Sequence, residues 1–346
     1  MEKIWSGNGI NLLSRGLALS HYYCPFVFLA RSLLSSVGMI KHNRPQRIIR
    51  AVPQRYLLDE LSPDKLLGET HHANNLIYVV DAFDSPAVMT EIGRLREVAF
   101  RRAGGGTGRR VDIDSDDLAP NGYRQMVVWN PYERQIVGGY RFIISRSEWP
   151  RHLSTEHYYT FSPRFRREYL PHTIELGRSF IQPRFQSGRG GLFALDNLWD
   201  GMGAVVSRSE GVRYLFGKVT VYPHRNPEAR QLLYTFLRTQ CPAVESLVSA
   251  RESCRVEVDV TRYKKLFNSG NYQENLRTLQ KNFKILGESI PPLIKSYINL
   301  SATMQAFDTV RNDDFGGVEE TAILLTVADI CPEKYERHFV QKQKVL

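Results

Sequence analysis

The stretch Thr173-Ile-Glu-Leu-Gly-Arg-Ser-Phe-Ile181 places a carboxylate and a guanidinium inside an otherwise apolar, strand-like run. Charges are costly there unless they are paired or used in a site. In a regular strand, Glu175 and Arg178 would point to opposite faces. A β-bulge at Gly177 would bring both side chains to one face and separate the strand from its neighbour. The run therefore predicts either a structural ion pair across a kink or a bulged strand that carries a site.

The composition of the chain is that of an ordinary globular protein, with 346 residues, 42% hydrophobic and 24% charged. Its four cysteines are far apart and form no CxxC or Cys/His cluster, which indicates a reduced compartment and no structural zinc. Residues 1–55 hold eight Lys/Arg and one Glu (8 − 1 = +7), so only +3 of the net +10 remains for the rest. A basic leading segment fits an anionic membrane surface or an acidic carrier protein, and no nucleic-acid motif accompanies it.

The N-terminal segment is apolar between residues 10 and 37 but is interrupted by Arg15, His21 and Arg31. No clear cleavage site for a signal peptide follows, and a membrane-spanning helix would need roughly 20 predominantly apolar residues. We predict that residues 1–38 are a non-native extension that precedes a natural start at Met39, with a membrane-surface helix as the second interpretation. The protein is then expected in the cytoplasm, with peripheral contact to the inner membrane.

Strands and helices alternate from residue 39 onward, which predicts an α/β fold. The expected strands are 76–81, 123–129, 135–144, 173–181, 212–222 and 321–327, and the expected helices are 85–102, 192–206, 227–239 and 272–286. Asn130-Pro-Tyr-Glu133 predicts a hairpin between the second and third strands. We find no internal repeat and no linker, so residues 39–346 are expected to form one domain, with a core at 70–240 and a C-terminal elaboration at 241–346.

The sequence lacks the motifs of several enzyme classes. No histidine starts an H-x4-D signature and no G-x-S-x-G elbow occurs. The loop Gly104-Gly-Gly-Thr-Gly108 lacks the Lys-Ser/Thr of a P-loop and is expected to be mobile. His71-His72 has no carboxylate at metal spacing, so we assign neither a metal nor a permanently bound cofactor.

Four clusters follow one another in a recognisable order: Arg96-x-x-x-Phe100, Asp112-Ile-Asp-Ser-Asp-Asp117, Gly138-Gly-Tyr-Arg141 and Glu175-Leu-Gly-Arg178. This order resembles the GNAT-superfamily N-acyltransferases that use acyl carrier protein, a group that includes the acyl-homoserine-lactone synthases. The resemblance is closer to the bacterial amino-acid-lipid N-acyltransferases often labelled hemolysin-like. It covers residues 70–340 and includes Ile290-Pro-Pro-Leu-Ile294 and Asp313-Asp-Phe-Gly-Gly-Val-Glu-Glu320.

The resemblance implies a GNAT-like acyl-CoA N-acyltransferase fold, which has a central mixed, twisted sheet with a bulged strand and helices on both faces. It also implies transfer of a 3-hydroxylated fatty acyl group from the phosphopantetheine thioester of acyl carrier protein to an amino acid, for membrane lipid biosynthesis. The insertion at 103–108 and the pair Glu319-Glu320 look most like the Bacteroidetes branch that acylates glycine. Ornithine as acceptor and a non-enzymatic, membrane-active hemolysin-like protein are the alternatives.

One departure from the wider superfamily concerns the donor. CoA-using relatives carry a Q/R-x-x-G-x-G/A pyrophosphate loop, whereas Phe185-Gln-Ser-Gly-Arg-Gly190 begins with Phe. This difference favours a carrier-protein donor.

The predicted site has three parts. Glu175 is the expected general base because burial raises the pKa of a carboxyl group, and it is grouped with Gly177, the expected thioester-docking point, and Arg178. The expected substrate-binding residues are Arg96, Phe100, Asp112, Asp114, Asp117 and Arg141, where Arg141 and Arg178 would hold the acceptor carboxylate. Donor phosphate would lie near Arg184, Gly188, Arg189 and Gly190, before a helix. A Glu175–Arg178 ion pair, a solvated acidic loop and a plain basic loop are the structural alternatives.

Overall fold

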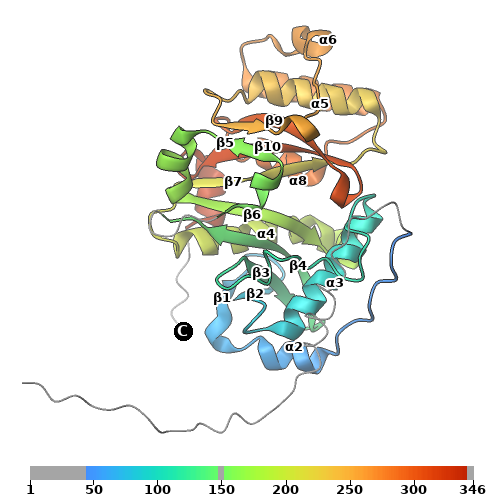
Figure 1. The fold of residues 1–346 in the computed structure, drawn as a ribbon, viewed down its shortest axis with the longest axis vertical. Coiled ribbons are helices and arrows are strands. Elements are labelled where there is room, and N and C mark those ends of the chain that lie inside the picture. Colours follow the sequence, from blue (N-terminus) through green and yellow to red (C-terminus); the bar gives the residue numbers. More distant parts are fainter. Residues whose placement is uncertain (1–43, 147–151, 341–346) are drawn as a thin grey trace, which may run out of the picture. The chain divides into compact units, whose positions relative to one another are not determined.

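The computed structural model describes residues 44–146 and 152–340, and the predicted extension at 1–38 lies outside them (Figure 1). The described helices are α2 (Gln54–Glu60), α3 (Pro86–Arg102), α4 (Gly188–Ser207), α5 (Pro227–Gln240), α6 (Thr261–Lys264), α7 (Tyr272–Ile285), α8 (Pro292–Ile298) and α9 (Pro332–His338). The described strands are β1 (Leu66–Glu69), β2 (Leu76–Val80), β3 (Arg124–Asn130), β4 (Gln135–Ile144), β5 (Tyr159–Phe161), β6 (Thr173–Ile181), β7 (Tyr214–Val221), β8 (Val248–Ala250), β9 (Gln305–Asn312) and β10 (Val318–Thr326). Within the described ranges, each helix is too short or too polar to cross a bilayer.

Eight strands form the central sheet in the order β1-β2-β3-β4-β6-β7-β10-β9, and β5 pairs with β8 in a small second sheet. Among the described strands of the central sheet, β6 and β7 are the one parallel pair, and the other neighbouring strands are antiparallel. The predicted mixed sheet is confirmed. β9 and β10 belong to it as well, so residues after 240 contribute two strands to the same sheet as the predicted core.

The parallel pair β6–β7 opens partway along its length. Its pairing ends at Leu176 opposite Gly217, although β6 continues to Ile181 and β7 to Val221. On the other side of β6, Arg178 and Ser179 together oppose one residue of β4, which is a β-bulge. The sequence predicted a bulge at Gly177, and the structure places it one residue later. Arg178 itself adopts the left-handed conformation, with φ +49°.

The left-handed conformation of Arg178 costs about 1–3 kcal/mol in a non-glycine residue. Two contacts of the side chain hold it there. Arg178 Nε lies 3.0 Å from Asp112 Oδ2, and the guanidinium lies 4.6 Å from the centre of the Phe315 ring. Tertiary contacts, and not glycine, therefore fix the bulge and turn Arg178 toward the face that carries Glu175.

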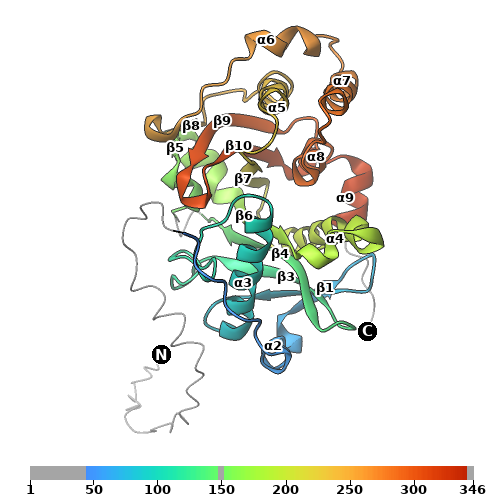
Figure 2. The same ribbon diagram turned by 90° about the vertical axis from the view of Figure 1, so that its right-hand side faces the viewer.

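Helices α3 and α4 cover opposite faces of the sheet (Figure 2). Arg96 of α3 donates to Gln125 of β3, whereas a Cβ at Gly201 of α4 would lie 2.4 Å from Sδ of Met126, the next residue along β3. Because neighbouring strand residues point to opposite faces, the two helices must lie on different sides. The α4 face also buries apolar residues of α5, α7 and α8 in the main core, and the other face carries the β5–β8 sheet.

The N-terminus of α3 is capped from outside the helix. Ser85 makes no side-chain capping bond, and instead Glu60 of α2 accepts from the backbone N–H of Ala87 and of Val88, at 3.0 and 2.8 Å. A carboxylate at this end also interacts favourably with the helix dipole. This contact fixes the helix that presents Arg96 to the sheet.

The glycine-rich loop after α3 was expected to be mobile, but the structure shows it packed. A Cβ at Gly105 would lie 3.0 Å from the Tyr222 ring, and one at Gly104 would lie 2.7 Å from the His224 ring. Gly316, in the β9–β10 turn, has Gly105 Cα within 3.0 Å of its own Cβ position. Glycines are needed here because the loop approaches the end of β7 and the β9–β10 turn too closely for side chains.

Candidate active site

Three arginines and three aspartates from four elements form one ion-pair network beside the bulge. Fully buried Arg96 donates to Asp117 Oδ2 at 3.1 Å, to Gln125 Oε1 at 2.5 Å and to the Asp112 carbonyl at 3.3 Å. Burial of such charges is tolerable only because each cation meets a carboxylate. The structure thus brings together Arg96 and Asp117, two of the residues that the sequence analysis assigned to substrate binding.

Arg141 and Arg178 share the remaining aspartates. Arg141 Nη1 donates to Asp114 Oδ2 at 2.6 Å, and Arg178 Nη2 lies 3.6 Å from the same oxygen. Asp116 is 4.0 Å from Arg141, at the edge of this network. Burial raises the pKa of Asp114, but Arg141 and Arg178 outweigh it and hold that pKa below its ordinary value. Asp114 therefore stays ionised between the two arginines.

Phe100, another predicted residue, joins the network through an aromatic contact. Its ring packs edge-on against Phe315, with the ring centres 5.0 Å apart, and the guanidinium of Arg178 lies over the Phe315 ring. Phe315 was not singled out from the sequence. Its place in Asp313-Asp-Phe-Gly-Gly was the only available signal, because the contact joins segments more than two hundred residues apart.

Glu175 lies on the same face of the sheet as Arg141 but has its own partners. Oε2 accepts from the Tyr123 hydroxyl and from Ser154 N at 3.1 Å, and Oε1 accepts from Ser154 Oγ at 3.1 Å and Thr155 N at 3.0 Å. Arg178 is not among them, so the structural alternative of a Glu175–Arg178 ion pair is wrong. Tyr123, Ser154 and Thr155 were missed, since no local pattern links a loop residue to a carboxylate on a distant strand.

The environment of Glu175 suits a proton acceptor. Burial raises the pKa of this carboxyl group above its ordinary value, against the lowering effects of Tyr123, Arg141 and Lys218. Burial and the negative charge of Glu175 also raise the pKa of Tyr123 well above the usual value. The Tyr123 ring lies 4.6 Å below the Arg141 guanidinium, which links the carboxylate to the ion-pair network.

Gly177 lies opposite Arg141 in the β4–β6 register, where a Cβ would approach Arg141 Nε to 3.4 Å. It is the last residue before the bulge and the first after the β6–β7 pairing ends. The backbone around Gly177 and Arg178 is therefore released from β7. Backbone groups that point toward β7 there lie outside the strand pairing, whereas Gly177 is still paired with Arg141 of β4, so a ligand could bind on the β7 side.

The predicted donor residues follow the end of β6, and among the described residues the structure shows no ion pair between Arg184 and the aspartates of the network. Helix α4 begins at Gly188, four residues earlier than expected, so Gly188, Arg189 and Gly190 form its first turn. The side chain of Arg189 lies outside the described part of the structure. Arg184 contacts Glu133 and donates to Gln135 Oε1 at 2.7 Å, both near the β3–β4 turn. The structure therefore gives Arg184 protein partners of its own.

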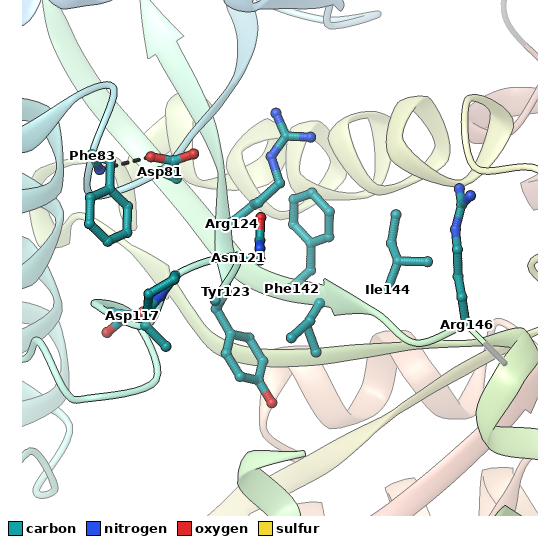
Figure 3. A pocket seen from close by; sticks show the side chains of 13 residues that line it. Asp81, Phe83, Asp117, Asn121, Tyr123, Arg124, Phe142, Ile144 and Arg146 are labelled. Atoms are coloured by element: carbon teal, nitrogen blue, oxygen red, sulfur yellow. Dashed lines mark hydrogen bonds between the residues drawn. The ribbon is translucent and has the colours of Figure 1, made fainter. Parts of the chain in front are cut away.

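A cavity of about 690 Å³ lies at the start of β3 and the end of β4 (Figure 3). Phe142 and Ile144 extend to one side of the strands, and Tyr123 extends to the other. The lining also includes Asp117, Ile143 and the exposed residues Arg124 and Arg146. Tyr123, one of the lining residues, donates its hydroxyl to Glu175, so one side chain separates the cavity lining from the buried carboxylate.

An opened parallel strand pair, a bulge and a buried carboxylate between helices on opposite faces define an N-acyltransferase of the GNAT class. Residues 95–196 match the family described as acetyltransferase (GNAT) domain. The glycine N(alpha)-acyltransferase of Phocaeicola vulgatus is 44% identical over 301 residues, which cover 85% of this chain and 92% of that protein. The protein of the same name from Bacteroides thetaiotaomicron is 43% identical over 301 residues, 85% of this chain and 89% of its own.

No solved structure matches the chain. The two relatives nevertheless cover most of its length, and the chain belongs to their family of GNAT N-acyltransferases. It is an enzyme, and this membership overturns the alternative of a non-enzymatic membrane-active protein.

Proposed function

We propose that the enzyme transfers a fatty acyl group from the thioester of acyl carrier protein to the amino group of glycine. The main structural support is Glu175, a buried carboxylate with a raised pKa beside the opening between β6 and β7. The relatives of the chain are named glycine N(alpha)-acyltransferases. The N-acylglycine product would enter membrane lipid synthesis. Ornithine is the second acceptor suggested by the sequence.

In the proposed reaction, the amine of glycine attacks the thioester carbonyl, the N–C bond forms and the C–S bond breaks. The sulfur of the carrier leaves as a thiolate with the electron pair of the C–S bond, the amine loses one proton, and that proton is finally returned to the thiolate to give the thiol. Among the described residues, the hydroxyl groups of Tyr123 and Ser154 both donate to Glu175, and the proton would reach the carboxylate through one of them. Tyr123 would pass its own proton to Glu175 and take the proton of the amine.

Residues after the end of β6 support acyl carrier protein, and not CoA, as the acyl donor. Phe185 stands where CoA-using relatives carry a Gln or Arg, and Arg184 is engaged by Glu133. These features leave little provision for an adenosine diphosphate, which CoA has and a carrier protein lacks. Action in the cytoplasm with peripheral membrane contact stays a prediction.

The test is a purified reaction with glycine or ornithine and with the same acyl chain on acyl carrier protein or on CoA, followed by mass spectrometry. We expect N-acylglycine from the carrier-protein donor. If the enzyme acylates ornithine and not glycine, ornithine is the acceptor in place of glycine. Equal rates with acyl-CoA would remove the carrier assignment, and no product with either amine would contradict the proposal.

We further propose that the 690 Å³ cavity takes the acyl chain, since Tyr123 and Ile143 connect it to Glu175: Tyr123 by hydrogen bond and Ile143 by β-pairing. Ala119→Trp, on the loop that lines the cavity, would fill part of it. The preference for a long-chain over a short-chain donor is expected to fall at least about tenfold, with the KM for glycine unchanged. Val244→Trp, at an exposed position away from the cavity, is the control. An unchanged preference in Ala119→Trp would place the chain elsewhere.

A further inference from the structure

We propose that Lys218 binds the carboxylate of the amino-acid acceptor together with Arg178. This inference rests on the proposed function and adds a residue that the sequence analysis did not single out. Lys218 follows Gly217, the last β7 residue paired with β6. It therefore stands on one arm of the opening, and Arg178 stands on the other.

Lys218 faces the reacting side of the sheet. Residues two apart on a strand share a face, so Lys218 points to the same side as Phe216, which pairs with Glu175 in the β6–β7 register. The positive charge of Lys218 is close enough to lower the pKa of Glu175 in part. The ammonium group is therefore near the proposed base.

A buried framework fixes the ammonium group of Lys218. Its Nζ donates to Glu320 Oε2 at 2.6 Å and lies 4.5 Å from the centre of the Tyr158 ring. Asn312 donates to the same oxygen of Glu320 at 2.9 Å and accepts from the Tyr158 hydroxyl at 2.8 Å. Burial would raise the pKa of Glu320, but Lys218 and Asn312 hold it below its ordinary value, so the carboxylate remains ionised.

The arginines and the lysine on this face differ in how many of their N–H donors have a partner among the described residues. Arg96 and Arg141 are nearly fully buried and occupied by aspartates, which leaves Arg141 poorly suited to its predicted role in carboxylate binding. An ammonium has three N–H donors, and within the described residues only Glu320 accepts one from Lys218. Arg178 likewise keeps its Nη1 group without a described partner.

Both side chains are also reachable, with 14% of Lys218 and 19% of Arg178 exposed. The Arg178 guanidinium lies over Phe315, and Lys218 lies over Tyr158, whose hydroxyl donates to Asn312 at the end of β9, so both cations lie beside the β9–β10 turn. Both charges also act to lower the pKa of Glu320, against the effect of burial. A small amino acid held by its carboxylate between them would carry its amino group into the opening. Two nearby cations would also favour the neutral, nucleophilic amine over the ammonium form.

The experiment compares glycine with glycinamide, which has the amine but no carboxylate. For Lys218→Met, the KM for glycine is expected to rise about 10- to 100-fold, with the KM for the acyl donor unchanged. The preference for glycine over glycinamide should fall by the same factor, and Lys218→Arg should restore part of it. Lys264→Met, at an exposed lysine of α6, is the matched control.

Removal of Lys218 alone leaves Glu320 buried without its cation, so the fold is checked with Lys218→Met/Glu320→Gln, which removes both charges. This double variant should show the same loss of preference. If kcat falls equally with glycine and with glycinamide, Lys218 acts on the thioester oxygen or on the fold, and the proposal is overturned. An unchanged preference for glycine over glycinamide in the Lys218 variants would overturn it as well. If the wild-type enzyme acylates no amino acid, the proposed function itself fails, and that result is visible before any variant is made.

Discussion

Glu175→Gln is expected to reduce kcat about 10²- to 10⁴-fold, the usual contribution of a positioned general base. The substitution removes the proton acceptor and turns an amide N–H₂ toward groups that already donate, among them Ser154 N and Thr155 N. That mismatch should also cost about 1–3 kcal/mol of stability. Kinetics are therefore measured at a temperature where the variant is folded, as judged by its thermal unfolding.

Two further variants separate catalysis from structure. Tyr123→Phe keeps the ring beside Arg141 but removes the hydroxyl that would relay the proton, so it should also lower kcat. Glu319→Gln removes a half-buried carboxylate bonded to Arg230 and Tyr234 on the other face of the sheet, and it should leave kcat unchanged. Full activity in a folded Glu175→Gln enzyme would show that Glu175 is not the general base. The family membership of the chain would not be affected.

The pH dependence follows from the direction of the Glu175 pKa. Because burial raises this pKa, the wild-type rate should fall as the pH drops through a value above the ordinary 4.5, and Glu175→Gln should lack that limb. The sign for stability is opposite to that of a paired carboxylate. The raised folded-state pKa means that the contribution of Glu175 to stability is greatest below pH 4.5 and is lost as the pH rises through the folded pKa. Urea unfolding of both proteins across this range measures the difference.

Arg96→Met is expected to lower the free energy of unfolding by about 3–5 kcal/mol, the usual cost of removing one partner from a buried ion pair. Asp117, itself 1% exposed, would keep Arg141 at 3.7 Å, the Gln125 amide at 3.0 Å and the Asp114 backbone N–H at 3.3 Å, and none of these is a direct ion pair as short as that with Arg96. Urea denaturation monitored by circular dichroism gives the value. Arg102→Met, at an exposed position of the same helix, should change it by less than about 0.5 kcal/mol.

An equal effect in Arg96→Met and Arg102→Met would show that the network does not stabilise the fold. A stable but inactive Arg96→Met enzyme would instead show that Arg96 positions the aspartates and arginines of the network for catalysis. The free energy of unfolding and the activity are both measured on purified Arg96→Met and Arg102→Met.

The elements that the sequence located well are those with a clear local pattern. α3 begins at Pro86 and ends at Arg102, and β6 spans 173–181 as expected, because helical spacing and a β-rich run are properties of neighbouring residues. β9 was missed. It carries Asp308, Arg311 and Asn312 and reads as polar, and it becomes a strand only because β10 pairs with it.

Local sequence pattern predicted a bulged strand that carries Glu175 and Arg178, and it named the arginines and aspartates that meet beside it. The partners of these residues follow from tertiary contacts. Arg178 bends the chain in place of Gly177 because Asp112 and Phe315 hold its side chain, and Glu175 turns to Tyr123 and Ser154 instead of Arg178. Lys218 and Glu320 meet across β7 and β10, more than a hundred residues apart. Local spacing encodes which face a residue occupies, whereas the choice among several buried partners depends on which distant segments pack there.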